Sequence, residues 1–92
     1  GRRSVVEFLL PEQPAAKRRW WGVLDEAEVD ICLKDPGFGI DLRVETSLKR
    51  LTELWMGRIG IDEALRDETL KLEGSREQRA AFREWFALAV VA

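Results

Sequence analysis

The chain has 92 residues, a formal net charge of −2, and a composition that is 46% hydrophobic and 35% charged. This balance is that of one folded globular domain, and it excludes an intrinsically disordered chain. The acidic balance argues against a nucleic-acid-binding surface, which usually has a basic excess. No apolar run approaches the roughly 20 residues that a membrane-spanning helix needs.

The chain contains one cysteine, Cys32, so it cannot form an internal disulfide. This usage is compatible with a reducing cytoplasm, where we expect the protein to be. The chain begins with glycine rather than methionine and almost at once enters a strand pattern. We therefore expect residues 1–92 to be a single domain cut from a longer protein.

The N-terminal half predicts four strands. Apolar residues dominate the first two segments, and strict alternation of apolar and polar residues marks the next two. A loop with two prolines and two tight turns separate them. The predicted strands are Ser4–Leu10, Arg18–Leu24, Glu28–Lys34 and Ile40–Thr46, with tight turns at Asp25–Ala27 and Asp35–Gly37.

Alternation also assigns side chains to the two faces of the sheet. Trp20 and Trp21 are neighbours in one strand, so we expect them on opposite faces. Cys32 is expected to serve as a small apolar residue in the third strand. The fourth strand should direct one row of residues to the same side: Ile40, Leu42, Val44 and Thr46.

From Ser47 the apolar spacing becomes helical. Thr46 or Ser47 can cap this helix, since a hydroxyl there accepts from an unpaired helix N–H. Gly57 should end it, because glycine takes the left-handed conformation without strain. The positions on its apolar side are Leu48, Leu51, Leu54 and Trp55.

The C-terminal third predicts a short helix, a strand and a last helix. The short helix spans Gly60–Asp67, and the strand Thr69–Glu73 follows it. The run Ser75–Gln78 has the pattern of a capping box, which marks the start of the last helix. The apolar side of that helix carries Ala81, Phe82, Trp85 and Phe86.

Strands and helices that are segregated along the chain indicate an α+β domain. We predict a five-stranded, mainly antiparallel sheet with three helices packed on one face.

The sequence lacks the residues from which common catalytic sites are built. Histidine is absent and there is a single cysteine, so the commonest general base and a thiolate zinc cluster are both lacking. The acidic pairs Asp25-Glu26 and Asp62-Glu63 are explained by a turn and by the first turn of a helix. We therefore expect neither an enzyme, nor a metal site, nor a cofactor.

Eight Trp and Phe residues give the chain a large apolar area. One interpretation places all of them in the core or in an interface, because so short a chain struggles to cover both faces of a sheet. Another lets some of them wall a cavity for a ligand. The candidate lining residues are Trp20, Trp21, Cys32, Leu51, Trp55, Trp85 and Phe86.

The stretch Asp41–Gly74 carries a resemblance to a known family. It reads as strand, helix, glycine stop, short helix and strand, and its key positions are Asp41, Leu48, Leu51, Gly57, Ile61, Ala64 and Leu72-Glu73-Gly74. In this it resembles the sterol carrier protein type 2-like domain, which implies a cavity for lipids. That family usually begins with a helix, and it has a glycine where this chain has Asp67-Glu68.

A second resemblance rests on RRWWGVL, EVDICLKDPGF and LTELWMGRIGIDEALR. These segments are similar to the C-terminal extension of some bacterial winged-helix regulators of the HxlR type. The likeness implies an upstream winged helix that contacts DNA, while this domain makes no DNA contact itself. It predicts a ligand-sensing and dimerisation domain of a transcriptional regulator, bound to a hydrophobic small molecule. A dimerisation module without ligand and a free-standing lipid carrier are the alternatives.

Overall fold

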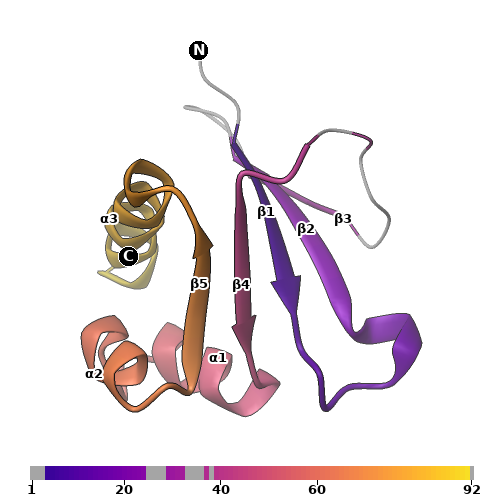
Figure 1. The fold of residues 1–92 in the computed structure, drawn as a ribbon. Coiled ribbons are helices and arrows are strands. Elements are labelled where there is room, and N and C mark those ends of the chain that lie inside the picture. The colour runs from indigo at the N-terminus through magenta and orange to yellow at the C-terminus, as the bar shows by residue number, and fades with distance from the viewer. Residues whose placement is uncertain (1–3, 25–28, 33–36, 38, 92) are drawn as a thin grey trace.

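The computed structural model describes residues 4–24, 29–32, 37 and 39–91. Figure 1 shows a sheet whose helices gather on the β4–β5 side, away from β3. The elements are β1 (Ser4–Leu9), the 3-10 helix η1 (Ala15–Lys17), β2 (Arg19–Leu24), β3 (Val29–Cys32), β4 (Leu42–Thr46), α1 (Leu48–Trp55), α2 (Ile61–Arg66), β5 (Leu70–Gly74) and α3 (Arg76–Val91).

This order confirms the α+β class and the three predicted helices. The turn predicted at Asp25–Ala27 lies outside the described residues, as do Glu28, Phe38 and the end of the third strand. In the second predicted turn only Gly37 is described, and its φ of +85° is in the left-handed region. The 3-10 helix within the predicted N-terminal loop was not predicted.

The sheet has five strands in the order β3-β2-β1-β4-β5, so the first strand of the chain lies at its centre. Strands β1, β2 and β3 form an antiparallel meander, and β4 pairs antiparallel with β5. Strands β1 and β4 run parallel, with Val6 opposite Leu42 and Phe8 opposite Val44. The sheet is therefore mixed.

One face of the sheet packs against the helices. The core that fills this space draws residues from β1, β4 and β5 and from all three helices, which agrees with helices on one face. Its fully buried part consists of Val6, Leu42, Val44, Leu54, Ala64, Leu70, Phe82 and Phe86.

The register assigns the two neighbouring tryptophans as predicted. Trp20 lies opposite Phe8 and Trp21 lies opposite Glu7 in the β1–β2 pair. Directly paired residues share a face, so Trp20 is on the helix-covered side with Phe8, and Trp21 is on the other side.

The fourth strand is shorter than predicted. It begins at Leu42, and Ile40, which was expected to face the core, is 41% exposed and outside the sheet. Asp41, which lies between Ile40 and Leu42, explains why the strand begins later than predicted. Asp41 accepts a hydrogen bond from the Val5 N–H at 2.8 Å and donates its own N–H to the Val5 carbonyl at 2.9 Å. This contact fixes where the strand enters the sheet.

Helix α1 begins and ends as its sequence predicts. The Ser47 hydroxyl accepts from the Arg50 N–H at 3.0 Å, so Ser47 rather than Thr46 is the N-cap. Gly57 has a φ of +73°, and its N–H donates to Leu54. The next N–H reaches back to Glu53 at 2.9 Å. These two bonds form a Schellman motif, in which the left-handed residue is usually glycine.

Helix α2 ends in the same motif without a glycine. The N–H of Glu68 donates to the Leu65 carbonyl at 3.3 Å, and that of Thr69 donates to the Ala64 carbonyl at 3.1 Å. Glu68 has a φ of +63° and holds the position that Gly57 holds in α1. The Asp67-Glu68 departure noted in the sequence therefore keeps the left-handed turn, but with a strained backbone at a residue that has a Cβ.

Replacing Glu68 with glycine should stabilise the protein. A left-handed residue with a Cβ costs about 1–2 kcal/mol, and the extra freedom of glycine in the unfolded chain offsets part of that gain. We expect Glu68→Gly to raise the free energy of unfolding by about 0.5–1 kcal/mol in urea denaturation. Glu68→Ala keeps the Cβ and is the matched control, with no gain expected. Equal stabilisation by both variants would contradict the strain.

Candidate functional site

An aromatic cluster joins β1, α1 and α3. The ring of Phe82 lies 6.2 Å from that of Phe8 and 5.8 Å from that of Phe86, and the indole of Trp55 lies 5.9 Å from Phe86. Trp85 completes the cluster, with its ring centre 6.0 Å from that of Phe82. These spacings are those of attractive ring pairs. The cluster thus forms a continuous apolar path from the sheet to α1.

The aromatic cluster reaches from the core to the surface. Phe82 and Phe86 are 3% and 5% exposed, whereas Trp55 at its outer end is 53% exposed. Leu48 on the same helix is 46% exposed, and Met56, its C-cap residue, is 59% exposed. We call Leu48, Trp55 and Met56 the α1 patch. So much open apolar area on one short helix is a feature of binding surfaces.

The structure brings four of the seven predicted lining residues together. Trp55 and Phe86 are in ring contact, and Leu51 and Trp85 pack against the same core. Trp20 is half-buried on the helix-covered side of the sheet, where its indole N–H donates to the Lys17 carbonyl at 2.8 Å.

The other two do not join this group. Trp21 is on the opposite face of the sheet, and Cys32 lies opposite Trp21 in the β2–β3 register. The side chain of Cys32 is outside the described part of the structure. Both positions therefore belong to the face of the sheet opposite the helices, away from the other five candidate lining residues.

The face of the sheet that carries Trp21 holds a buried charge that the sequence analysis missed. Glu7 is 2% exposed, and its carboxylate accepts from the Arg43 Nε at 2.8 Å. The same guanidinium contacts Glu73 at 3.4 Å. Next to this pair, the indole Nε1 of Trp21 is buried and has no hydrogen-bond partner among the described residues. The signal in the sequence was a glutamate in the middle of an apolar strand.

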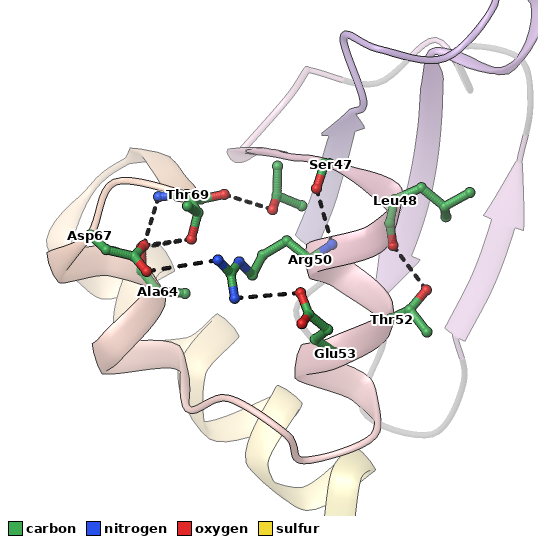
Figure 2. A network of polar contacts seen from close by, with 9 residues as sticks. Ser47, Leu48, Arg50, Thr52, Glu53, Ala64, Asp67 and Thr69 are labelled. Atoms are coloured by element: carbon green, nitrogen blue, oxygen red, sulfur yellow. Dashed lines mark hydrogen bonds and ion pairs between the residues drawn. The ribbon is translucent and has the colours of Figure 1, made fainter.

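A polar network fastens α1 to the turn between α2 and β5 (Figure 2). The guanidinium of Arg50 contacts Glu53 at 3.4 Å and Asp67 at 3.8 Å. Asp67 accepts from the Thr69 N–H at 3.0 Å and from its hydroxyl at 2.5 Å. The Thr69 carbonyl in turn accepts from the Thr46 hydroxyl at 2.7 Å. The network therefore joins α1 both to the turn between α2 and β5 and to the end of β4.

The network shifts the titration of one carboxyl. Hydrogen bonds from the Thr69 hydroxyl, then from its N–H, lower the pKa of Asp67 below the ordinary value of 3.8, and Arg50 adds a smaller effect. A group with a lowered pKa in the folded state stabilises the fold fully above its ordinary pKa. That contribution is lost as the pH falls through the folded-state pKa.

Removing the hydroxyl of Thr69 should raise the pKa of Asp67. In Thr69→Val the first-ranked donor is gone while the N–H remains, so the pKa should move toward 3.8. A ¹³C NMR titration of the carboxyl groups between pH 2 and 6 measures it. Thr52→Val is the control, because the Thr52 hydroxyl donates to the Leu48 carbonyl instead. An unchanged pKa in Thr69→Val would contradict the assignment.

In the part of the chain that the structure describes, two surface cavities are lined by residues of the helices. The α1 groove, about 590 Å³, runs along α1, and its lining includes Leu48, Met56 and Glu12. The Glu12 carboxylate accepts from the Leu48 N–H at 2.9 Å, and a hydrogen bond from Gln13, then one from Leu48, lowers its pKa. The second cavity, about 310 Å³, lies between α2, β5 and α3. The aromatic cluster lines neither cavity.

Among the described residues, no group of three or more potential Cys, Asp or Glu ligands is placed to hold a metal ion. Within the same residues, no helix combines the length and apolarity needed to cross a bilayer.

Comparison with known proteins identifies the fold. No protein-family model and no curated protein sequence matches the chain. The structure of the ubiquinone synthesis protein UbiJ-SCP2 matches with a TM-score of 0.72 and 17% identity, over 96% of this chain and 66% of that one. The sterol carrier protein domain 2 of Helicoverpa armigera matches with a TM-score of 0.74 and 15% identity, over 98% and 71%.

A third match is the apo form of sterol carrier protein 2 from Yarrowia lipolytica, with a TM-score of 0.64 and 20% identity, over 94% of this chain and 68% of that one. The chain therefore spans about two thirds of the length of these structures. It has the sterol carrier protein type 2-like fold, as the sequence resemblance implied. At these identities the likeness concerns the fold alone.

Proposed function

Starting from this fold, we propose that the chain binds a hydrophobic small molecule or lipid without catalysing a reaction on it. The observation that carries the proposal is the indole of Trp55, which is 53% exposed yet in ring contact with the buried Phe86. An apolar ligand that covered this indole would remove apolar area from water at about 25 cal/mol per Å². The neighbouring side chains of the α1 patch would extend the contact.

We further propose that the domain senses this ligand within a cytoplasmic bacterial regulator. The support is the sequence likeness to the extension of HxlR-type regulators. A ligand that binds one arrangement of sheet and helices more tightly than another shifts the population toward it. Attached DNA-binding domains would then respond through that difference in affinity, without any contact between this domain and DNA.

Ligand binding is tested with fatty acids and a fluorescent lipid probe added to the purified domain. We expect saturable quenching of tryptophan emission and a higher melting temperature, since a ligand at 100 times its Kd stabilises by about 2.7 kcal/mol. Trp55→Ala should weaken binding about tenfold. Trp21→Phe, on the other face of the sheet, is the control and should bind like the parent. If no lipid of the panel changed the tryptophan emission or the melting temperature, the proposal would be contradicted.

Dimerisation is the second candidate, favoured by the exposure of Leu48, Trp55 and Met56. In that case the α1 patch meets its copy across a two-fold axis. Light scattering at micromolar concentration should then give twice the monomer mass, and Met56→Glu should return a monomer. A monomeric parent protein would contradict this candidate and leave the ligand proposal standing.

A further inference from the structure

The second cavity is lined by one stripe of α3. Arg76, Arg79 and Arg83 recur at helical spacing with Ala80 among them, so they share a face of the helix. This stripe differs from the one that carries Phe82 and Phe86 into the core. Figure 1 shows α3 beside β5, and the cavity lies where α3, β5 and α2 meet. We call it the arginine pocket.

The arginine pocket concentrates positive charge. Among the described residues, the charged ones that line it are all arginines, and none is acidic. Arg83 pairs with Asp62 of α2, whereas Arg76 and Arg79 have no acidic partner within the described residues. Like charges three and four residues apart on a helix repel each other, so this arrangement costs stability when the pocket is empty.

Two of the other arginines have acidic partners, whereas the remaining described ones, Arg18, Arg19, Arg58 and Arg66, have no described carboxylate within ion-pair distance. Arg43 contacts Glu7 and Glu73, and Arg50 contacts Glu53 and Asp67. Acidic residues are available to pair with arginines, because the chain has 17 Asp and Glu against 15 Lys and Arg. Arg76 and Arg79 differ from those unpaired arginines in that both line one cavity, so the two guanidinium groups together are suited to an anion from outside the chain.

The rest of the pocket wall is apolar. Leu65 of α2 and Leu72 of β5 line it, are half-buried, and pack against the core on their other sides. Ala80 leaves room between the arginines. At about 310 Å³ the pocket is at the small end of ligand sites, which are about 300–1,000 Å³. It has room for an ionic group and a short apolar segment.

We propose that the arginine pocket binds an anionic amphiphile, through a carboxylate or phosphate ester group joined to an alkyl chain. Arg76 and Arg79 hold the anion, for which the guanidinium fork provides paired N–H donors. The alkyl chain lies on Leu65 and Leu72. This site is separate from Trp55 and stands whether or not the aromatic cluster binds a ligand.

The experiment measures the binding of four probes by calorimetry at low salt: octanoate, octyl phosphate, octanol and inorganic phosphate. The test variant is Arg76→Gln/Arg79→Gln. The control is Arg19→Gln/Arg66→Gln, which removes the same charge from exposed positions that line neither this pocket nor the α1 groove. Melting curves verify that both double variants are folded, since all four arginines are exposed.

We expect octanoate and octyl phosphate to bind at least tenfold more tightly than octanol or phosphate alone. The test variant should lose that advantage, while the control variant and Trp55→Ala keep it. Three results would overturn the proposal. They are octanol binding as tightly as octanoate, phosphate binding as tightly as its octyl ester, and equal weakening in the test and control variants.

Discussion

Phe82→Ala is expected to lower the free energy of unfolding by about 3–5 kcal/mol, the range for deleting a buried phenyl ring. Phe82 is 3% exposed and is the ring that connects Phe8 on the sheet to Trp85 and Phe86 on α3. Its removal leaves a cavity and also breaks these ring contacts. For a small domain this is a large part of the total stability, which is about 0.05–0.15 kcal/mol per residue.

Urea denaturation followed by circular dichroism measures the effect. Phe82→Leu is the matched control, since it retains much of the buried apolar volume and should cost less than half as much. Glu84→Ala, at an exposed position of the same helix, should change stability little. A loss below about 1 kcal/mol in Phe82→Ala would mean that the ring does not join the sheet to α3.

Arg43→Met is expected to cost about 2–3 kcal/mol, because it leaves the Glu7 carboxylate buried without its charged partner. Glu7 is buried, with 3% of its side chain exposed, whereas Arg43 is 41% exposed and can be contacted by water. The expected loss is therefore set below the range for a fully buried pair. Denaturant unfolding at pH 7 measures it.

Glu73→Gln separates the contribution of the buried Arg43–Glu7 contact from that of the exposed Arg43–Glu73 contact. Glu73→Gln breaks only the contact between Arg43 and a carboxylate that is 72% exposed, so it should cost less than about 0.5 kcal/mol. The double variant Glu7→Gln/Arg43→Met should regain part of the stability lost in Arg43→Met, since the uncompensated charge is gone. Equal losses in Glu73→Gln and Arg43→Met would contradict the burial of the pair.

Local features of the fold were readable from the sequence. The opposite facing of Trp20 and Trp21 follows from strand alternation, and the end of α1 at Gly57 follows from its permitted backbone angles. Glu68 at the equivalent position of α2 gave no such signal, because its side chain disfavours the conformation it adopts.

Features that depend on distant parts of the chain were not readable. The parallel pairing of β1 with β4 and the exposure of Ile40 are set by the contact between Val5 and Asp41, which lie 36 residues apart. The burial of Glu7 depends in the same way on Arg43 in a different strand.

The candidate site shows the same division. Helical spacing grouped Leu51 with Trp55, and Phe82 with Trp85 and Phe86, and the structure brings both groups to the same region. The arginine stripe of α3 is also present in the sequence as spacing. That these arginines line a pocket depends on Leu65 of α2 and Leu72 of β5, which form the rest of its wall. Spacing along a helix says nothing about which other elements face it.

The central place of β1 in the sheet has a consequence for the order of folding. Among the strands of the sheet β1 is made before the others, yet its parallel partner β4 leaves the ribosome only after β2 and β3 have followed it. Until then one edge of β1, with Val6 and Phe8 in it, has unpaired backbone groups that another chain could contact. The pairing of β1 with β4 is also slow, because many residues separate the two strands in the sequence. Nascent or refolding chains should therefore be most prone to aggregation before β4 docks, and dilution should improve the refolding yield.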